Sequence, residues 1–476
     1  MLSRLLGNPV IGKALVKIIK GRAFKPYSLT VEESIEKQKI MLSEKFGRMA
    51  ETSIGKKLGV QQGIKLDELP LTDYSFYQSF FANPSQDAFM YRIDEYERVR
   101  TSGTYGSEKW FMIPHVSFAK FRETGLAIVM ATFHDGDKIT FDYGDTLYVN
   151  VAPKPFLGGH VIANFGRDTQ GIINIVPNTN LSFREKEQFF IRNHKNIDGS
   201  VMLASSIISD IEGKVDEKIS LKGLLTLDSQ IADVYKERIE AFIGTPPKTI
   251  YGATETLGCT VPSIKHPLGF FFDWRRGIFE FEPVAEAVKE DRTVKQMNEV
   301  EEGKIYRLIF TSLEGELTRY VINDCFLCIS KGDDVLGTEF PVFKFHSRLD
   351  KDISLQNFTR IDEQELISAL RSSNVEFVDF TARCEIKDGL QYLAIYVEQI
   401  GHMPAEQIEK SLQSYLYKAD SDYKAVVDFF GYVPLKVRLL AKGTFSRYME
   451  EKEASWGKVE RINMKEGEFE NLIRPL

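Results

Sequence analysis

The spacing of apolar residues predicts helices near the N-terminus of the chain. Between residues 28 and 70, apolar positions recur every three to four residues, as in the stretch TVEESIEKQKIMLSEKFGRMAETSIGKKLG, and this period is that of one helix face. Thr30 is followed three residues later by Glu33, a pattern typical of a capping box. We therefore expect a helix to begin just after Thr30.

From about residue 85 to residue 350, short β-type runs are separated by helical stretches. The runs expected to be strands are LAIVMATF, TLYVNVA, GIINIV, KTIYG, GIFEFEP and KIYRLIF. The stretch SLKGLLTLDSQIADVYKERIEAFIG is expected to be helical, and the charged tract EAVKEDRTVKQMNEVEEGK to be a solvated loop. Strands that alternate with helices predict an α/β fold in which helices cover sheets.

After residue 350 the pattern predicts a small α+β domain. EQELISALRSS is expected to be helical, VEFVDFTARCEI alternates at period two, and Lys387-Asp388-Gly389 predicts a hairpin turn into LQYLAIYVEQI. The helix AEQIEKSLQSYLYKA, a further helical piece and the strand PLKVRLLA follow. This order predicts a three-stranded sheet. We place the boundary near Ser347–Lys351, which gives domains 1–347 and 348–476.

Composition narrows the class of protein. A chain of 476 residues is long enough for two or more domains, and it is 43% hydrophobic and 27% charged, as globular proteins are. Its 61 basic and 68 acidic residues give a net charge of −7, which argues against nucleic acid as the main partner. Four cysteines argue against a disulfide scaffold, and no stretch of 18 apolar residues exists. We expect a cytoplasmic protein with no stable membrane insertion.

The N-terminal segment is basic throughout. It carries six basic residues, and Glu32 is the first acidic one. The positions spaced as on an amphipathic helix are Leu15, Ile18, Ile19, Lys13, Lys17 and Lys20. Charges interrupt any apolar core, so the segment is not a signal peptide. We expect a helix that caps the large domain; weak contact with a membrane surface is the alternative.

A short polar stretch, Thr101–Lys109 (TSGTYGSEK), combines hydroxyl residues, two glycines and a lysine. Glycines allow tight turns and close approach, and hydroxyls and backbone N–H groups donate to phosphate. The Walker pattern GxxxxGK[ST] is absent. The stretch is therefore either a loop that cradles a phosphate or a polar hairpin between two strands.

A second motif, Tyr251–Thr256 (YGATET), follows the strand run KTI. Strand ends are where α/β sheets place ligands. Tyr251 offers a ring face for a base, Thr254 a hydroxyl for a phosphate, and Glu255 a hard oxygen ligand suited to Mg²⁺. The alternative is a plain turn whose tyrosine belongs to the core.

Two further motifs carry charged groups. The stretch LTRYVIND ends in Asp324, and an ionised carboxylate accepts two hydrogen bonds from a ribose diol; the alternative is a turn-capping aspartate. The stretch GKVER contains Lys458, a mobile point charge for a phosphate or a developing oxyanion; the alternative is a surface lysine.

Two other features carry less weight. Cys325 and Cys328 have the spacing of a redox pair, but residues three apart on a strand point to opposite faces, so we expect no thiol pair. His134 is a candidate for an acyl pocket, and a core or loop histidine is the favoured interpretation.

The chain resembles the adenylate-forming superfamily of acyl-CoA ligases, peptide-synthetase adenylation domains and luciferases. The resemblance rests on five patterns in a fixed order: TSGTxGxxK, YGxTE, YxxxD, Arg-x-Asp (348–350) and GKVxR. Within it, the chain is most similar to the Gretchen Hagen auxin-responsive acyl-acid amido synthetases. The similar segments outside the shared motifs are Ala50–Gly59, Phe279–Pro283, Leu317–Tyr320 and Gly443–Phe445. The resemblance implies a large N-terminal adenylate-forming domain of helix-covered sheets and a small, mobile α+β C-terminal domain that carries a catalytic lysine.

The resemblance also implies roles for individual residues. Those implied to bind the nucleotide are Thr101, Ser102, Gly103, Thr104, Gly106, Lys109, Tyr251, Gly252, Ala253, Thr254, Tyr320, Asp324 and Arg348. Lys458, Thr254 and Glu255 are the implied catalytic residues, with Glu255 also the metal ligand. Arg348 takes the domain-boundary position, and Asp350 is the hinge candidate.

Several positions depart from the family patterns. Asn323 replaces the glycine before the ribose aspartate, and Glu460 replaces the proline before the final arginine. Ser354 and Asn357 stand where acyl-CoA ligases have a lysine and the glycine that lines the pantetheine channel. A side chain in place of that glycine would crowd the channel, which favours an amine acceptor over coenzyme A.

We therefore expect an ATP- and Mg²⁺-dependent ligase that activates a small carboxylic acid as its acyl-adenylate and transfers the acyl group to an amine or amino acid. An acyl-CoA or aryl-CoA ligase with the same first half-reaction is the alternative. A nucleotide-binding regulatory protein without turnover is a third hypothesis, and the presence of both Glu255 and Lys458 argues against it.

Overall fold

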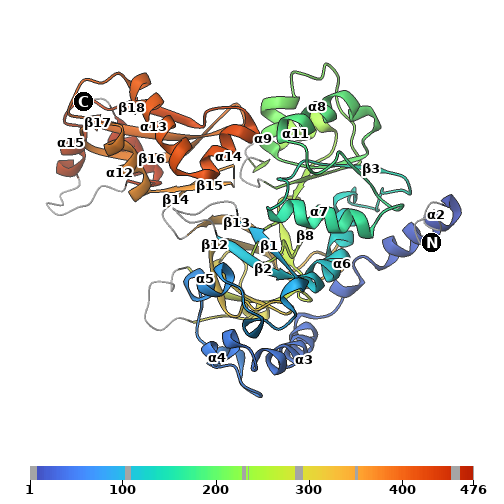
Figure 1. Cartoon of the computed structure of the whole chain (residues 1–476). Coiled ribbons are helices and arrows are strands. Elements are labelled where there is room, and N and C mark those ends of the chain that lie inside the picture. Colours follow the sequence, from blue (N-terminus) through green and yellow to red (C-terminus); the bar gives the residue numbers. More distant parts are fainter. Residues whose placement is uncertain are drawn as a thin grey trace. The chain divides into compact units, whose positions relative to one another are not determined.

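The chain folds into two compact units, which are described separately. The computed structural model describes residues 8–101, 109–227, 232–233, 235–284, 293–348, 352–356, 358–451 and 461–474. Every described residue up to Arg348 belongs to the large unit, and every described residue from Asp352 onward belongs to the small unit (Figure 1).

The large unit begins with helices, as the apolar spacing predicts. Their bounds are α2 Pro9–Arg22, α3 Val31–Met49, α4 Ser53–Leu58 and α5 Tyr74–Ala82. The expected capping box is present, because the Thr30 side chain accepts from the Glu33 N–H and the Glu33 side chain accepts from the Thr30 N–H. Satisfying these two backbone donors fixes the start of α3.

A parallel five-stranded sheet has the order β4-β3-β5-β6-β7. Its strands are β3 Thr146–Val149, β4 Asn174–Val176, β5 Gly199–Met202, β6 Gly223–Thr226 and β7 Pro247–Thr249. The helices α6 His115–Thr132, α7 Leu157–Asp168, α8 Phe183–Asn193, α9 Ala204–Ser206 and α11 Lys236–Ile243 lie between or before them in the chain. Helices between parallel strands confirm the predicted α/β class.

Two of the predicted elements were wrong. The run LAIVMATF lies almost wholly in the buried helix α6 and not in a strand, since a short apolar run does not distinguish a buried strand from a buried helix. The stretch from residue 220 to 244, expected to be helical throughout, begins with strand β6 and ends with helix α11.

A second, antiparallel sheet has the order β10-β11-β12-β13-β9-β8. Its strands are β8 Thr260–Pro262, β9 Phe270–Phe272, β10 Gly277–Pro283, β11 Ile305–Ser312, β12 Tyr320–Ser330 and β13 Val342–Arg348. A separate hairpin pairs β1 Tyr96–Arg100 with β2 Trp110–Pro114. Short single-turn helices occur at 25–27, 66–68, 86–88, 93–95, 194–196, 207–211 and 297–299.

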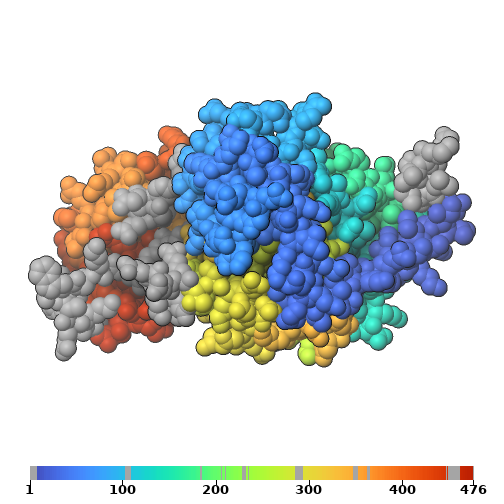
Figure 2. All heavy atoms as spheres, turned by 90° about the horizontal axis from the view of Figure 1, so that it is seen from below, coloured from blue at the N-terminus to red at the C-terminus, as the bar shows by residue number. Residues whose placement is uncertain are grey.

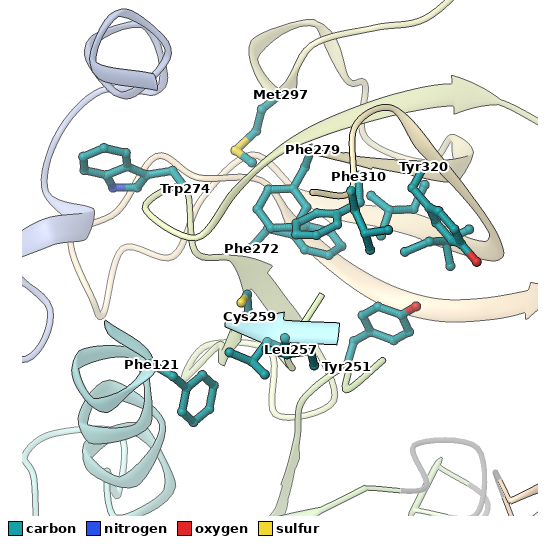
Figure 3. Close-up of a cluster of buried hydrophobic side chains, with 14 of the residues drawn as sticks. Phe121, Tyr251, Leu257, Cys259, Phe272, Trp274, Phe279, Met297, Phe310 and Tyr320 are labelled. Carbon is teal, nitrogen blue, oxygen red and sulfur yellow. The ribbon is translucent and has the colours of Figure 1, made fainter. Parts of the chain in front are cut away.

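The main core of the large unit is rich in aromatic rings. Phe272 and Phe279 lie at its centre with their ring centroids 4.5 Å apart (Figure 3). The buried Gln38 side chain of α3 donates to the Trp274 and Gly277 carbonyls, at 2.7 and 2.8 Å. The N-terminal helices therefore pack on the antiparallel sheet, and Figure 2 shows their residues in blue beside the yellow segment that contains β10.

The small unit follows the order that the sequence predicts. Its strands are β14 Asp352–Leu355, β15 Thr359–Asp362, β16 Phe377–Lys387, β17 Leu390–Gln399 and β18 Leu435–Leu439. Its helices are α12 Glu363–Ser372, α13 Ala405–Ala419, α14 Ser421–Phe430, α15 Thr444–Glu451 and α16 Glu466–Ile473. The three-stranded sheet β16-β17-β18 is confirmed. Asp388 and Gly389 turn the hairpin with φ of 52° and 78°, as a primed turn requires.

Within the described part of the chain, no helix combines the length and apolar composition that crossing a bilayer requires.

Candidate active site

The predicted phosphate loop connects β1 to β2. The Thr101 N–H donates to the Lys109 carbonyl at 3.0 Å, which continues the antiparallel pairing one step beyond Arg100 and Trp110. Ser102, Gly103, Thr104 and Gly106 lie outside the described residues, so their phosphate contacts stay a prediction. A hairpin and a phosphate loop are compatible, because the tip of a hairpin presents unpaired backbone donors.

Lys109 lies at the β2 side of this hairpin, beside α5. Its ammonium nitrogen is 5.3 Å from the centre of the Tyr74 ring. The Tyr74 hydroxyl accepts from the Trp110 N–H at 3.0 Å. Tyr74, at the start of α5, therefore contacts the residues at which the predicted phosphate loop enters β2.

The second motif begins two residues after β7 ends. Tyr251 is buried, and Thr260 ties its backbone on both sides: the Thr260 hydroxyl accepts from the Tyr251 N–H and donates to the Tyr251 carbonyl, both at 2.9 Å. The Tyr251 ring packs against Phe270 and Phe326, with centroids 6.1 and 4.7 Å away. The tyrosine is thus a core residue, as the alternative interpretation held, and base stacking on it stays a prediction.

The polar end of the same tyrosine joins the second motif to the third. The Tyr251 hydroxyl donates to the Asp324 carboxylate at 2.6 Å, although 73 positions separate them in the chain. In the β12–β13 pair, Asp324 stands opposite Arg348. The fold therefore brings three of the sequence-predicted residues to one place, of which Arg348 is placed by its backbone alone.

The departure at Asn323 has a structural explanation. Asn323 lies inside β12, and it is not among the described residues with positive φ. An extended position needs no glycine, so asparagine is tolerated there without backbone strain. Its side-chain oxygen accepts from Arg307 at 3.3 Å, a contact that glycine would lack.

Positive φ occurs at two other residues next to the motifs. Leu257 has φ of 55° and Arg319 has φ of 45°, and non-glycine residues in this region store strain that surrounding contacts must hold. Arg319 is held by an ion pair to Glu280 at 3.1 Å and by a hydrogen bond to the Leu69 carbonyl at 2.8 Å. Tyr320, the next residue, is buried, and burial raises the pKa of its hydroxyl well above the usual value.

A pocket adjoins the YGATET motif. Residues 254–257 form one wall, residues 111–114 of β2 a second and residues 314–317 a third. Most of the lining is apolar, and the polar lining comes mainly from Thr254, Arg276 and three glutamates. An apolar cavity with a few polar groups is the usual form of a small-molecule site.

The three glutamates of this cavity differ in their partners. Glu314 pairs with Lys120 at 3.2 Å and Arg276 at 3.4 Å. Glu316 accepts from the Tyr96 hydroxyl at 2.5 Å. Burial raises the pKa of both carboxyls. Glu255 is only partly buried, and no other described residue forms a hydrogen bond or an ion pair with it.

A metal would have to be held by few protein ligands. No group of three or more His, Cys, Asp or Glu side chains is arranged to bind a metal ion within the residues that the structure describes. Mg²⁺ in nucleotide sites is typically bound by one or two carboxylates and the substrate's phosphates. Glu255, a carboxylate with no described partner, fits that requirement.

Sequence reasoning missed the residues of the 314–316 turn and Arg276. The only signal was an acidic Glu-Gly-Glu turn between two β-type runs. All four cysteines are outside disulfides, and Cys325 and Cys328 are both buried. His134 lies in a loop where its Nδ1 accepts from the Gly136 N–H at 3.1 Å, as the favoured interpretation held.

Lys458 and Asp350 lie outside the described residues, but both ends of the segment that carries Lys458 are placed. Before it, the Glu398 carboxylate accepts from the Gly443 and Phe445 N–H groups at 2.6 and 2.9 Å, at the start of α15. After it, Arg461 pairs with Asp379 of β16 at 2.6 Å. Residues before and after the lysine-bearing segment therefore contact the β16–β17 hairpin of the small unit.

Comparison with known proteins identifies relatives of the chain. A model of the GH3 family central domain matches residues 271–348, the segment that includes Tyr320 and Asp324. The indole-3-acetic acid-amido synthetase GH3.3 of Arabidopsis thaliana is 26% identical over 193 residues, which are 36% of this chain and 30% of that protein. The matched segment thus spans less than a third of that curated relative.

Solved structures show the same fold over nearly the whole chain. The AtGH3.15 acyl acid amido synthetase in complex with 2,4-DB has a TM-score of 0.52 and 14% identity, covering 98% of this chain and 96% of that one. The 2-hydroxyisobutyryl-CoA ligase in complex with 2-HIB-AMP and CoA has a TM-score of 0.62 and 15% identity, covering 92% and 91%. The chain is therefore similar to the GH3 amido synthetases, with one segment that matches the GH3 family central domain, and it has the fold of the adenylate-forming ligases.

Proposed function

We propose that the protein is an ATP- and Mg²⁺-dependent acyl-acid amido synthetase of the cytoplasm. The observation that supports this most directly is the junction of Tyr251 and Asp324 at 2.6 Å, with Glu255 four residues along the same loop and without a described partner. A ribose-binding carboxylate and a metal-binding carboxylate are the two acidic groups that an adenylation site requires.

In the first half-reaction, a carboxylate oxygen of the acid attacks the α-phosphorus of ATP. A new oxygen–phosphorus bond forms, the bond to the β-phosphate bridge breaks, and pyrophosphate leaves. Two anions must be brought together, so catalysis is mainly positioning and charge stabilisation. Bound Mg²⁺ would neutralise phosphate charge beside Glu255. Thr254, the 101–109 loop and Lys458 supply the protein's donors.

The remaining predicted residues either bind the ribose and base of the nucleotide or lie at the boundary between the units. Asp324 accepts from the ribose hydroxyls, and Tyr251, Gly252, Ala253 and Tyr320 form the base and ribose side of the site. Arg348 and Asp350 stand at the boundary between the units. In the second half-reaction, the nitrogen of an amine or amino acid attacks the acyl carbon, AMP leaves with the bonding electrons, and the nitrogen loses a proton.

One observation favours an acyl-CoA ligase instead. The TM-score with 2-hydroxyisobutyryl-CoA ligase, 0.62, exceeds that with the amido synthetase, 0.52. The acceptor region argues the other way: Ser354 lies in β14, paired with Arg360 of β15, and Asn357, outside the described residues, takes the place of the channel glycine. A glycine there is what leaves room for a pantetheine arm.

The test separates activation from transfer. Purified protein, ATP and Mg²⁺ are incubated with a panel of small carboxylic acids, and pyrophosphate release is measured with hydroxylamine as a trap. Acids that respond are then offered amino acids and, separately, coenzyme A, and the products are identified by mass spectrometry. We expect amides and no thioester. Thioester formation would support the ligase alternative.

Two variants control this experiment. Glu255→Gln should lower pyrophosphate release and shift its Mg²⁺ dependence to higher concentration, because one negative charge at the metal is lost. Glu36→Gln, on the exposed surface of α3, should behave as the unmodified protein does. No pyrophosphate release with any acid in the panel would support the non-catalytic nucleotide-binding hypothesis.

A further inference from the structure

The helix α2 uses one side to pack on the large unit. Val16 is buried in a core cluster with Met130 and Phe133 of the α6 region. At Gly12 an added Cβ would lie 2.0 Å from the Tyr143 ring, so a larger residue would require that ring to shift. Lys20 reaches Asp142 at 3.4 Å. The expected capping role of the basic N-terminal helix is therefore confirmed for this side.

The opposite side of α2 is exposed and apolar. Val10 is 77% exposed, Ile11 41% and Ile18 52%, and Ala14 between them is also exposed. Residues four apart lie on one helix face, so Val10, Ala14 and Ile18 form a continuous row. In Figures 1 and 2, α2 lies at the edge of the large unit.

Basic residues border this apolar row. Lys13 and Lys17 are exposed and four apart, on the face next to the row, and Arg22 is exposed at the C-terminal end of the helix. No described acidic residue forms an ion pair with any of the three, in contrast to Lys20. An apolar row flanked by lysines is the pattern of helices that lie in a membrane interface.

Charge is distributed unevenly along the chain, and the segment that contains α2 is its basic part. All 68 acidic residues lie at or after Glu32, and the 31 residues before it contain six basic ones, although the net charge of the protein is −7. A negatively charged protein is repelled by an anionic surface unless a basic region faces that surface. The positive segment and the exposed apolar row coincide on α2.

We propose that the exposed face of α2, formed by Val10, Ile11, Ala14, Ile18, Lys13 and Lys17, docks the protein reversibly on anionic phospholipid membranes. The three large aliphatic side chains enter the interface, and the lysines meet lipid phosphates or carboxylates. Docking is peripheral, because no described helix is long and apolar enough to span a bilayer. A second copy of the chain is a poorer occupant, because pairing two such faces brings lysines of like charge together.

The test is co-sedimentation of the full chain with two kinds of vesicle. One kind is phosphatidylcholine alone, and the other contains phosphatidylserine at about one lipid in three, a charge density at which each nearby lysine contributes measurably. We expect binding to the phosphatidylserine vesicles at low salt, at least about tenfold weaker binding to phosphatidylcholine, and loss of binding as salt rises above about 0.3 M.

Variants assign the binding to this face. Lys13→Glu with Lys17→Glu should weaken binding to phosphatidylserine vesicles by at least about tenfold, and Ile11→Asp with Ile18→Asp should do the same. Ile40→Asp is the matched control: Ile40 is 65% exposed on α3, away from the basic segment, and this variant should bind as the unmodified protein does. All these positions are exposed, so melting temperatures should agree.

Three results would overturn the proposal. The unmodified protein could bind both kinds of vesicle equally, it could bind neither, or both double variants could bind as the unmodified protein does. Sedimentation equilibrium without lipid tests the other occupant: a dimer that Ile11→Asp with Ile18→Asp converts to monomer would show that a second copy covers this face. Because the readouts need no substrate, failure here is distinguishable from failure of the proposed enzymatic function.

Discussion

The contact between Tyr251 and Asp324 connects the aromatic core to the proposed ribose-binding carboxylate. The Tyr251 ring is part of the aromatic core, and its hydroxyl holds the carboxylate at 2.6 Å. A carboxylate oriented in this way loses little conformational freedom when a ribose binds, which is the energetic advantage of preorganisation. A core residue thus contacts the proposed ribose-binding carboxylate directly.

Asp324→Ala should weaken ATP binding by about 1–3 kcal/mol, the usual cost of losing hydrogen bonds to a charged group. Tyr251→Phe keeps the carboxylate and removes one hydrogen bond to it, so it should weaken ATP binding by less, about 1 kcal/mol. Isothermal titration with ATP measures both. If Asp324→Ala binds ATP as tightly as the unmodified protein, ribose recognition does not depend on this residue.

The limits of sequence reasoning are also visible in single residues. Thr30, Asp388 and Gly389 carry local signals, a cap and a turn, and the structure confirms them. For Glu314 and Glu316 the acidic turn is the only local signal, and it does not place them at the cavity, which they line through the pairing of β11 with β12 and the approach of β1 and α6. Contacts between segments far apart in the chain do not follow from residue type or spacing.

Among the elements, strands β10 and β11 and the order of the small unit followed from periodicity, and α6 did not. Its last turns are apolar on all sides because other elements surround them, so the helical period is hidden. The helix α3 shows the opposite case. Its amphipathic pattern is clear, yet the pattern does not reveal that Lys45 is buried on its inner face.

Lys45 links α3 to the turn that borders the cavity. Its ammonium donates to the Leu317 carbonyl at 2.8 Å and to the Thr318 hydroxyl at 2.9 Å. Burial lowers the pKa of Lys45 to about 7. In the unfolded chain the pKa of a lysine is about 10.4, so between these values the unfolded state binds a proton that the folded state does not.

The sign of the pH effect follows from this difference. Stability rises with pH wherever the unfolded state binds more protons. The unfolding free energy should therefore rise by about 1 kcal/mol per pH unit from pH 7 to pH 9 because of Lys45. Lys45→Met should remove this contribution to the slope in urea titrations, and Lys37→Met, at an exposed position of the same helix, should keep it. Parallel slopes for Lys45→Met and the unmodified protein would contradict the assignment.

We expect Asp379 of strand β16 to position Lys458, the proposed catalytic lysine, through Arg461. The Asp379–Arg461 pair, at 2.6 Å, fixes the chain three residues after Lys458. Asp379→Ala should slow acid-dependent pyrophosphate release by about tenfold to a hundredfold, since small displacements of a reacting group have effects of this size. Asp379→Glu should restore part of the rate.

A matched ion pair in the same unit controls for general destabilisation. Glu466 pairs with Arg383 at 2.5 Å and is largely exposed, and exposed pairs contribute little to stability. Glu466→Ala should leave pyrophosphate release unchanged. If both alanine variants slow the reaction equally, the Asp379 pair has no special role in positioning Lys458.

In the molecule as a whole, the two units have separate cores. The aromatic cluster around Phe272 is drawn from the large unit alone, and the cluster around Leu393 and Ile395 from the small unit alone. Neither core therefore includes residues of both units. Such an architecture is compatible with the hinge motion that two half-reactions at one carbonyl require.

Substitution of Lys458, the proposed catalytic lysine, tests the hypothesis of a hinge motion between the two half-reactions. A neutral side chain at position 458 leaves the charge that develops during adenylation uncompensated, and loss of a preorganised group typically lowers a rate by about 10² to 10³. Lys458→Ala should therefore suppress acyl-adenylate formation from acid and ATP, measured by pyrophosphate release. The same variant should convert a chemically supplied acyl-adenylate to amide at nearly the unmodified rate, because the lysine has no part in that step.

Asp350→Pro should give the contrasting result. Proline fixes φ and stiffens the boundary, so adenylation should be spared while overall amide formation from acid, ATP and amine slows. The pair of variants thus distinguishes a missing charge from a restricted motion. Equal loss of both half-reactions in Lys458→Ala, with an unchanged circular dichroism spectrum, would mean that the lysine supports the structure of the small unit and does not act on the adenylate.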